Sequence, residues 1–328
     1  MPHGLPLLYF AANLTYAAGA NEAPQMAVDT PKLDRVKLLA AKIETTTGTA
    51  EALTASDATF IILNPVMTPD DPTNEREYPA DLGQLASVPG GRSAKCTFDV
   101  ELMGSGATGV PAWASTFLPA CNWDEDTGTF SYTRSGTTLT IALYEDGLKR
   151  TMSGCRGTFK ISMKSGEPAK VSFEFTGKYN AVSDTSILEP TFPTTIPPIF
   201  AGSTVSIGGS FTPVLSTFEI DIANEVVLRE DATDASAYKG AAIVAMKPTG
   251  TLDPETKTAA TRDWHDKLLN ASEESLSIVI GSASNNTITI ASTKMQAMKA
   301  GRGNRNKLLT DAVSVQFNGA DPLTIAFS

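Results

Sequence analysis

Segments in which apolar and polar residues alternate recur along most of the chain. Clear examples are residues 98–102, 139–143, 159–163 and 171–175. Alternation with a period of two is typical of a β-strand with one face in a core and the other in solvent. Turns such as residues 145–147 separate the segments, and short connections favour antiparallel pairing. The sequence therefore predicts a mainly β protein built from antiparallel strands.

The same order of segments occurs twice. The first copy consists of residues 59–66, 98–102, 139–141 and 171–177 and a helical segment that contains Trp113 and Phe117. Their counterparts, in the same order, are residues 217–226, 242–246, 276–278 and 313–319 and a helical segment that contains Trp264 and Leu268. In each helical segment the two apolar residues lie one turn apart on one face. Matches in a single order favour a duplication. Two unrelated β domains with similar strand patterns are the alternative.

A proline-rich stretch at residues 189–198 separates the two copies. Proline fixes φ and lacks an N–H group, so we expect a stiff, extended connector and a domain boundary there. The predicted organisation is an N-terminal arm at 1–34, a first fold at 35–185, a linker at 186–204 and a second fold at 205–328. Each fold is expected to be a β-sandwich or barrel with one short flanking helix.

The first segment of the chain is rather apolar between residues 5 and 20. A secretory signal is one explanation, but the segment lacks a basic start and is interrupted by Pro6 and Asn13. We favour an arm that packs on a neighbour. No run in the sequence is long and apolar enough to span a bilayer.

Charge and cysteine content exclude several classes of function. The 328 residues include 26 Lys and Arg against 36 Asp and Glu, a net charge of −10. Such a chain is a poor candidate for gripping nucleic acid by its phosphates, although it suits a channel through which nucleic acid slides. Cys96, Cys121 and Cys155 show no zinc-site spacing, and we expect them in the core as free thiols.

A glycine-rich loop at residues 104–109 matches the pattern G-x-G-x-x-G after a strand and before a helix. A dinucleotide site needs a βαβ unit behind this loop. Here the helix stops before Pro119, antiparallel strands follow, and the second copy lacks the glycines. We therefore expect a flexible corner between a strand and a helix, and no cofactor.

Other candidates for chemistry are weak. His265 lies on a helical segment with charged neighbours, which is typical of a solvated face, and no Ser-His-Asp arrangement is present. The basic run at residues 301–307 is interpreted as a charged loop tip that meets an acidic neighbour. No catalytic residue and no metal ligand is predicted, so the chain is not expected to be an enzyme.

The longest connection in the first copy runs from residue 67 to residue 91, against residues 230–239 in the second. Connections of this length without secondary structure are usually functional, with a disordered surface loop as the alternative. Its most polar residues are Asp70, Asp71, Glu75, Arg76, Glu77 and Tyr78.

One family combines these features. The chain resembles the tail tube proteins of long-tailed, non-contractile bacteriophages in several segments. These are residues 98–102 leading into Gly104-Ser105-Gly106, the short helix that follows, and residues 139–144, 153–157 and 166–177. Residues 53–58 are similar to the family too. The resemblance covers residues 53–179 well and is looser from residue 218 to residue 327, where it depends mainly on the repeat.

The resemblance implies a virion structural protein, assembled in the bacterial host cytoplasm, whose rings stack into a hollow tail tube. Strands of neighbouring subunits would join into an inner barrel, and DNA would pass through without specific binding. The tape measure, tail terminator and distal tail proteins would be partners. Because the family usually has one fold per chain and six-fold rings, two folds favour a homotrimeric, pseudo-hexameric ring; a homohexamer is the alternative.

The resemblance also implies roles for two groups of residues. The long connection would reach the adjacent ring through Asp70, Asp71, Glu75, Arg76, Glu77 and Tyr78. Alternation places Asp99 and Glu101 on the solvent side of their strand, where they would face the lumen and repel DNA. The rival interpretation of the whole chain is a tandem immunoglobulin-like binding or decoration module, which would be a soluble monomer.

Overall fold

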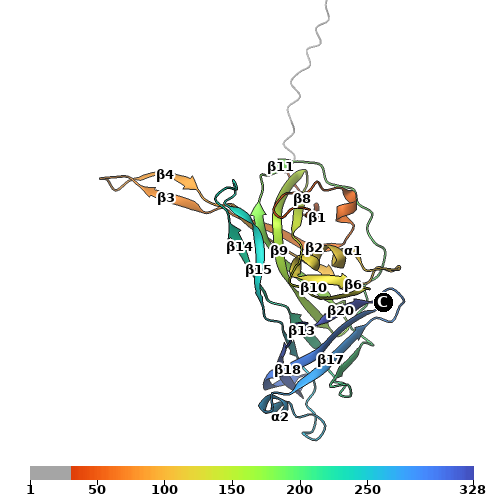
Figure 1. Cartoon of the computed structure of the whole chain (residues 1–328). Coiled ribbons are helices and arrows are strands. Elements are labelled where there is room, and N and C mark those ends of the chain that lie inside the picture. The colour runs from red at the N-terminus through yellow and green to blue at the C-terminus, as the bar shows by residue number, and fades with distance from the viewer. Residues whose placement is uncertain (1–30) are drawn as a thin grey trace, which may run out of the picture. The chain divides into compact units, whose positions relative to one another are not determined.

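The computed structural model describes residues 31–328, which form a mainly β structure (Figure 1). One large sheet contains sixteen strands, two further hairpins form two-stranded sheets, and all the ladders are antiparallel. The predicted mainly β, antiparallel class is confirmed. Within the described residues, no helix has the length and apolar character needed to cross a membrane.

Two sets of six strands follow the same order across the large sheet. The first set is β1 (Lys37–Ile43), β8 (Leu139–Glu145), β9 (Leu148–Lys164), β10 (Lys170–Tyr179), β5 (Ser93–Glu101) and β2 (Ile62–Asp70). The second set is β12 (Thr204–Ile207), β17 (Glu273–Ile280), β18 (Ile288–Arg305), β19 (Leu308–Phe317), β16 (Thr249–Leu252) and β13 (Thr217–Asp221). Each strand pairs with the next in its set. The repeat seen in the sequence therefore has a counterpart in strand order. One predicted match is wrong: the place of β5 is taken by β16, whereas residues 242–246, the expected counterpart of residues 98–102, lie in the strand Tyr238–Met246 of a separate two-stranded sheet.

The two sets are joined because β9 pairs with strands of both. Its first half pairs with β8, and its second half lies between β10 on one edge and β13 on the other. A second connection runs through β20 (Thr324–Phe327), which pairs with β18 and with β7 (Thr129–Tyr132). The remaining strands are β6 (Trp123–Asp126), which pairs with β7, and β11 (Ser183–Asp184), which pairs with β9.

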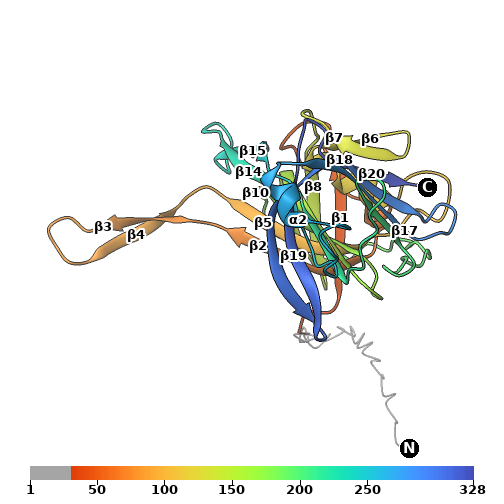
Figure 2. The ribbon, with the colours of Figure 1, turned by 90° about the horizontal axis from the view of Figure 1, so that it is seen from below.

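The connection at residues 67–91 is a β-hairpin, so the expected loop without secondary structure is wrong. Residues 67–70 continue β2 in register with residues 93–96 of β5, and β3 (Thr73–Glu77) and β4 (Gln84–Pro89) extend the ribbon. Figure 2 shows this hairpin extending away from the large sheet. All five side chains of β3 are exposed. Because neither face of the hairpin is buried, its sequence has no period-two pattern to reveal it.

The corresponding ribbon in the second set is shorter. It consists of β14 (Asn224–Glu230) and β15 (Tyr238–Met246), joined by residues 231–237. In both sets the ribbon begins at a residue with positive φ, Asn64 in the first and Ala223 in the second. These positions interrupt the ladder and change the direction of the strand.

Two short helices lie where the sequence predicts them. α1 (Ala112–Phe117) begins after Pro111, and α2 (Trp264–Leu269) begins after Asp263, whose carboxylate accepts two backbone N–H bonds. Two 3₁₀ turns complete the structure, at Ala55–Ala58 and Pro119–Cys121.

The core of the first set is aromatic. The ring of Phe117 from α1 lies 4.8 Å from that of Phe98 on β5 and 5.3 Å from that of Phe173 on β10. Phe98 and Val100 are buried while Asp99 and Glu101 are half-buried, which confirms the predicted alternation. Burying such rings removes apolar area from water, the main favourable contribution to folding.

The three cysteines are free and buried, as predicted. Burial raises the pKa of the Cys96 thiol to about 12 and raises the pKa of the Cys121 and Cys155 thiols as well. Thiols with such pKa values hold their proton at neutral pH and are poor nucleophiles. They act as small apolar core residues.

The glycine-rich loop makes backbone contacts. The Gly104 N–H donates to Asn286 Oδ1 (2.8 Å), and the Gly106 N–H donates to the Asn285 carbonyl (3.0 Å). A Cβ atom on Gly104 would lie 2.3 Å from the Asn285 oxygen. Glycine is required there because two backbone segments approach closely.

The proline-rich segment has no helix or strand between residues 185 and 198. It is fixed by side-chain bonds: the Thr195 hydroxyl donates to the Ser105 carbonyl (3.2 Å), and Asn286 Nδ2 donates to the Ile196 carbonyl (2.9 Å). The domain boundaries drawn around it stay a prediction, and the first thirty residues of the predicted N-terminal arm lie outside the described residues.

Candidate assembly surfaces

The junction between β9 and β13 shows how one set of strands joins the other. Ile161 lies opposite Ile220, and Met163 lies opposite Phe218; all four side chains are at most 1% exposed. On the other face, Lys160 forms a 2.8 Å ion pair with Glu219. After the strand ends, the Ser165 N–H donates to the Ser216 carbonyl (2.8 Å) and continues the contact.

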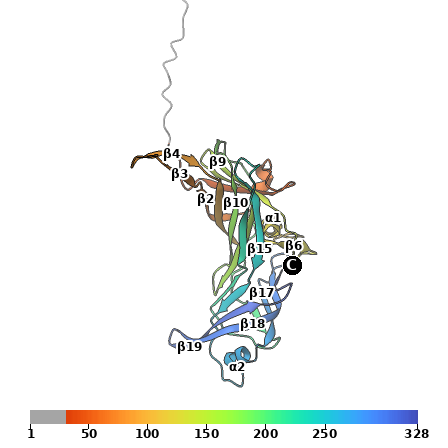
Figure 3. The same cartoon turned by 60° about the vertical axis from the view of Figure 1, so that its left-hand side comes forward.

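The ribbon β14–β15 adds a second contact, because it lies against β9 and β10 (Figure 3). Asn224 Nδ2 donates to the carbonyls of Cys121 (2.9 Å) and Gly157 (3.0 Å). Gly154 and Gly240 approach so closely that a Cβ atom on Gly154 would lie 2.6 Å from the Gly240 Cα. Both glycines have positive φ. The junction therefore depends on backbone approach as well as on side chains.

A buried carboxylate supports this close approach. Glu44 is 8% exposed and accepts four hydrogen bonds, from the backbone N–H groups of Gly48 and Gly154 and the hydroxyls of Thr138 and Thr140, at 2.7–2.9 Å. Four donors compensate for the loss of hydration that a buried charge suffers. Glu44 thus holds the irregular part of β9 at Gly154, against which Gly240 rests.

An ion pair closes the same junction at the end of the ribbon. Lys178 Nζ lies 2.7 Å from Asp234 Oδ2, and the Ser236 N–H and hydroxyl donate to Asp234 Oδ1. The hydrogen bond from Lys178, with those from Ser236, holds the pKa of the Asp234 carboxyl well below its ordinary value. The folded ribbon therefore favours the charged form of Asp234.

The large sheet has one continuous polar face, which crosses both sets of strands. Asp99 lies opposite Ser172 of β10, whose hydroxyl donates to it (2.6 Å), and Glu101 lies opposite Lys170. Ion pairs Lys95–Glu174 (2.9 Å) and Lys160–Glu219 lie on this face too. The polar face therefore carries charges of both signs rather than acids alone.

The hairpin β3–β4 carries the other predicted residues. Asp70 ends β2, Asp71 follows it, Glu75, Arg76 and Glu77 lie in β3, and Tyr78 comes directly after β3. All six are exposed. None of the charged ones takes part in the ion pairs found among residues 31–328. Unpaired charges on a projecting ribbon are available to another molecule.

Comparison with protein families decides what kind of protein has these surfaces. A model of the family described as phage tail tube protein matches residues 35–327. The chain belongs to the phage tail tube protein family. No match was found among curated proteins.

Membership of the tail tube family fixes the role at a general level. The chain is a structural component of the virion tail, it is not an enzyme, and it assembles with itself and with other tail proteins. The resemblance to tail tube proteins is confirmed for the family, and the family favours this role over a tandem immunoglobulin-like binding or decoration module.

The remaining chemical candidates have structural roles in this tail tube protein. The backbone N–H of His265 donates to Asp263 at the start of α2. In the basic run, Arg305 lies 2.9 Å from Asp253 and 3.2 Å from Glu255, so it meets acidic neighbours of its own chain. The described part of the chain contains no group of three or more His, Cys, Asp or Glu side chains placed to hold a metal.

The sequence did not reveal the residues at the junction. The alternating pattern places Ile161 and Met163 on one face of a strand, but nothing in it indicates β13 as the partner. Gly48, Gly154 and Gly240 meet there, but they lie too far apart in the sequence for their spacing to indicate the contact.

Proposed function

We propose that three copies of this chain form a pseudo-hexameric ring, and that the rings stack into the tube of a long, non-contractile phage tail through which DNA passes. The observation that supports this proposal is the repeated strand order, β1-β8-β9-β10-β5-β2 and β12-β17-β18-β19-β16-β13. If each set is one tube fold, as the predicted domains 35–185 and 205–328 state, three chains supply six folds. A homohexamer with twelve folds is the alternative.

Stacking is assigned to the hairpin β3–β4. It projects from the sheet, its side chains are exposed, and the second set has only residues 231–237 at the same place. In this proposal Asp70, Asp71, Glu75, Arg76, Glu77 and Tyr78 contact the adjacent ring. Three hairpins per ring would then alternate with three short turns.

The lumen is assigned to the polar face of the large sheet, with Asp99 and Glu101 among its residues. The opposite face of these strands is buried in the core, so it cannot line a channel. A face with both signs of charge has no surplus of cations to hold DNA phosphates. Within the host cytoplasm, tape measure, tail terminator and distal tail proteins would set the length and close the ends.

Imaging and mass measurement of the purified full chain test this function. Negative-stain class averages should show rings and tubes, and native mass spectrometry should give three times 34.6 kDa, about 104 kDa, per ring. Averages with six whole chains per ring would contradict the trimer. A monomer at high concentration would contradict the assembly itself. Virions whose tube is surrounded by a sheath would contradict the non-contractile assignment.

A further inference from the structure

Several strand edges have no partner among residues 31–328, and two of them resemble the edges that join the two sets of strands. β2 pairs with β5 on one edge only. In β18, residues 299–305 pair with β19 on one edge only. The other edge of β18 pairs with β17 at residues 288–296 and has no partner at residues 299–305. Unpaired edges expose N–H and C=O groups, which readily pair with another strand.

These two edges correspond to the two strands that form the internal junction. β18 occupies the place in the second set that β9 has in the first, and β2 occupies the place of β13. β13 pairs with the second half of β9 on the edge that carries β8. The unpaired edge of β18, next to β17, is therefore equivalent to the edge of β9 with which β13 pairs. The unpaired edge of β2 is equivalent to the edge of β13 that pairs with β9.

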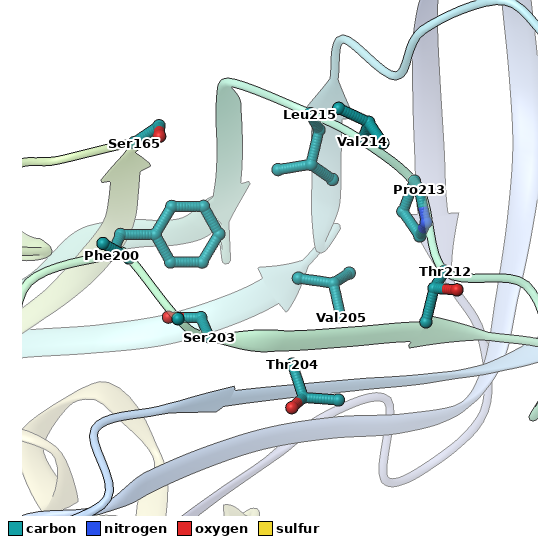
Figure 4. A pocket seen from close by; sticks show the side chains of 11 residues that line it. Ser165, Phe200, Ser203, Thr204, Val205, Thr212, Pro213, Val214 and Leu215 are labelled. Atoms are coloured by element: carbon teal, nitrogen blue, oxygen red, sulfur yellow. The ribbon is translucent and has the colours of Figure 1, made fainter.

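A groove runs along the unpaired edge of β2. It has a volume of about 780 Å³ and is lined by residues 34, 35 and 37–39 at β1, by residues 60–66 at β2 and by Phe192 of the proline-rich segment. Its counterpart in the second set lies between Phe200–Val205 and Thr212–Leu215 and measures about 360 Å³. Figure 4 shows Ser165, from the turn after β9, at the side of this counterpart near Phe200. The smaller groove is the one that already has a neighbouring strand beside it.

The side chains at the two unpaired edges are more exposed than the corresponding side chains at the internal junction. Ile161 and Phe218 are 0% exposed, whereas their counterparts Ala300 and Ile62 are only partly buried against the core. Val66 on β2 and Met298 on β18 are 50% and 51% exposed. These apolar side chains have the exposure expected of a junction that lacks its second half.

We propose that the unpaired edge of β18 in one chain pairs antiparallel with the unpaired edge of β2 in a second copy, repeating between chains the junction that β9 and β13 form within one. The proposal rests on the proposed function. Each chain then has one edge of each kind, so the contact is head-to-tail, and such contacts close into a ring when the rotation permits.

The internal junction also predicts the register. Ile161 and Ala300 lie opposite the matching residues Val171 and Val313. Across the sheet, Ile62 lies in line with Val171 through Val100, and Phe218 lies in line with Val313 through Leu252, so Ile62 corresponds to Phe218. The pair Met163–Phe218 therefore becomes Arg302–Ile62 between chains, and the next pair, Ser162–Glu219, becomes Gly301–Leu63 on the polar face.

Paired cysteines in the full chain test the contact. Directly opposite residues of an antiparallel pair have Cβ atoms about 4.5–5.5 Å apart, near the range for a disulfide. Gly301→Cys is sterically acceptable, since its Cβ atom would meet only the Ala312 oxygen at 3.7 Å, and the native cysteines are buried. Oxidised Gly301→Cys/Leu63→Cys protein should give two-chain and three-chain bands on a non-reducing gel, which reduction removes.

The matched control combines Gly301→Cys with Thr176→Cys. Thr176 lies on the same polar face but on β10, which has a strand on each edge, so it has no free edge to offer. A second pair, Arg302→Cys/Ile62→Cys, repeats the test one residue along the predicted register, in case the first pair fails to fold.

The outcomes separate the contact from the function. If rings form but neither pair cross-links more than the control, the contact is overturned while the tail tube function stands; another occupant of the groove, such as the chain's own first thirty residues, gives this result. Protein that does not assemble at all overturns both. Bands up to six chains support the contact and replace the trimer by a hexamer.

Discussion

Glu44 shows how one side chain fixes the junction between the two sets of strands. Its carboxylate accepts four hydrogen bonds, including one from Gly154 N–H, at the point where Gly154 meets Gly240. A charged acceptor in a buried place stabilises a structure only while every donor is oriented toward it. The close approach of the two glycines thus depends on a residue in β1's neighbouring turn, far from both in sequence.

Glu44→Gln should destabilise the chain. The amide is the same size, but its NH₂ group would face hydroxyl and N–H donors, so at least one buried donor loses its acceptor. We expect a loss of about 3 kcal/mol in the free energy of unfolding, because hydrogen bonds to charged groups contribute about 1.5–3 kcal/mol each. Urea denaturation measures it. Glu101→Gln, half-buried on the polar face, is the control and should change stability little; equal effects would contradict the role of Glu44.

Asp234 should make the junction sensitive to acid. Its carboxyl pKa is lower in the folded chain, chiefly through the hydrogen bond from Lys178, than the value of about 3.9 for an unfolded aspartate. A depressed folded pKa contributes stability above the unfolded pKa, and this contribution is lost as the pH falls through the folded pKa. The free energy of unfolding of the native chain should exceed that of Asp234→Asn by a constant amount above about pH 5, and this difference should shrink below about pH 4. Denaturation curves from pH 3 to pH 7 measure it, and an advantage that grows on acidification would contradict the assignment.

The stacking role of the hairpin β3–β4 is inferred from its length rather than from its contacts within the chain. Replacing residues 73–89 with Asn-Gly would keep the Gly90 N–H to Pro72 carbonyl bond as the closing bond of a two-residue turn. We expect this variant to fold and form rings but to lose stacking, because the exposed ribbon is gone. Negative-stain imaging should show single rings in place of tubes.

A second variant separates length from charge in this hairpin. Changing Glu75, Arg76 and Glu77 to Ser preserves β3 and its pairing with β4. Tubes that form normally from this variant, but not from the shortened one, would assign stacking to the backbone of the ribbon. Tubes of normal length from the shortened variant would show that stacking lies elsewhere.

The elements could be predicted from sequence where one face is buried. Phe98, Val100 and their neighbours in β10 alternate because a core lies on one side, and Pro111 marks the start of α1. The hairpin at residues 67–91 could not be recognised, because both faces are in solvent and no burial imposes a period. The pairing of Ile161 with Ile220 was equally hidden, since period two indicates which face is buried but never which strand is adjacent.

At the scale of the whole chain, the polar face connects fold to function. It runs across strands of both sets, so a ring of chains would present it as one surface. The predicted lumen acids Asp99 and Glu101 are balanced there by lysines, with Lys170 opposite Glu101 and Lys95 paired with Glu174. Balance of this kind fits a conduit better than strong repulsion would, because neither sign of charge then dominates what passes.

Shifting that balance should make the tube hold DNA. Asp99→Lys with Glu101→Lys adds four positive units per chain to the polar face, and each phosphate contact by a lysine raises affinity in a salt-dependent way. If the face lines the bore, assembled variant tubes should retain short duplex DNA at about 50 mM salt and release it at about 200 mM, while native tubes retain none. Asp124→Lys with Glu125→Lys on exposed β6 is the matched control for charge. Equal retention by both variants would show that the polar face has no special position, since net charge alone would then explain binding; retention confined to the first variant would place Asp99 and Glu101 where the DNA runs.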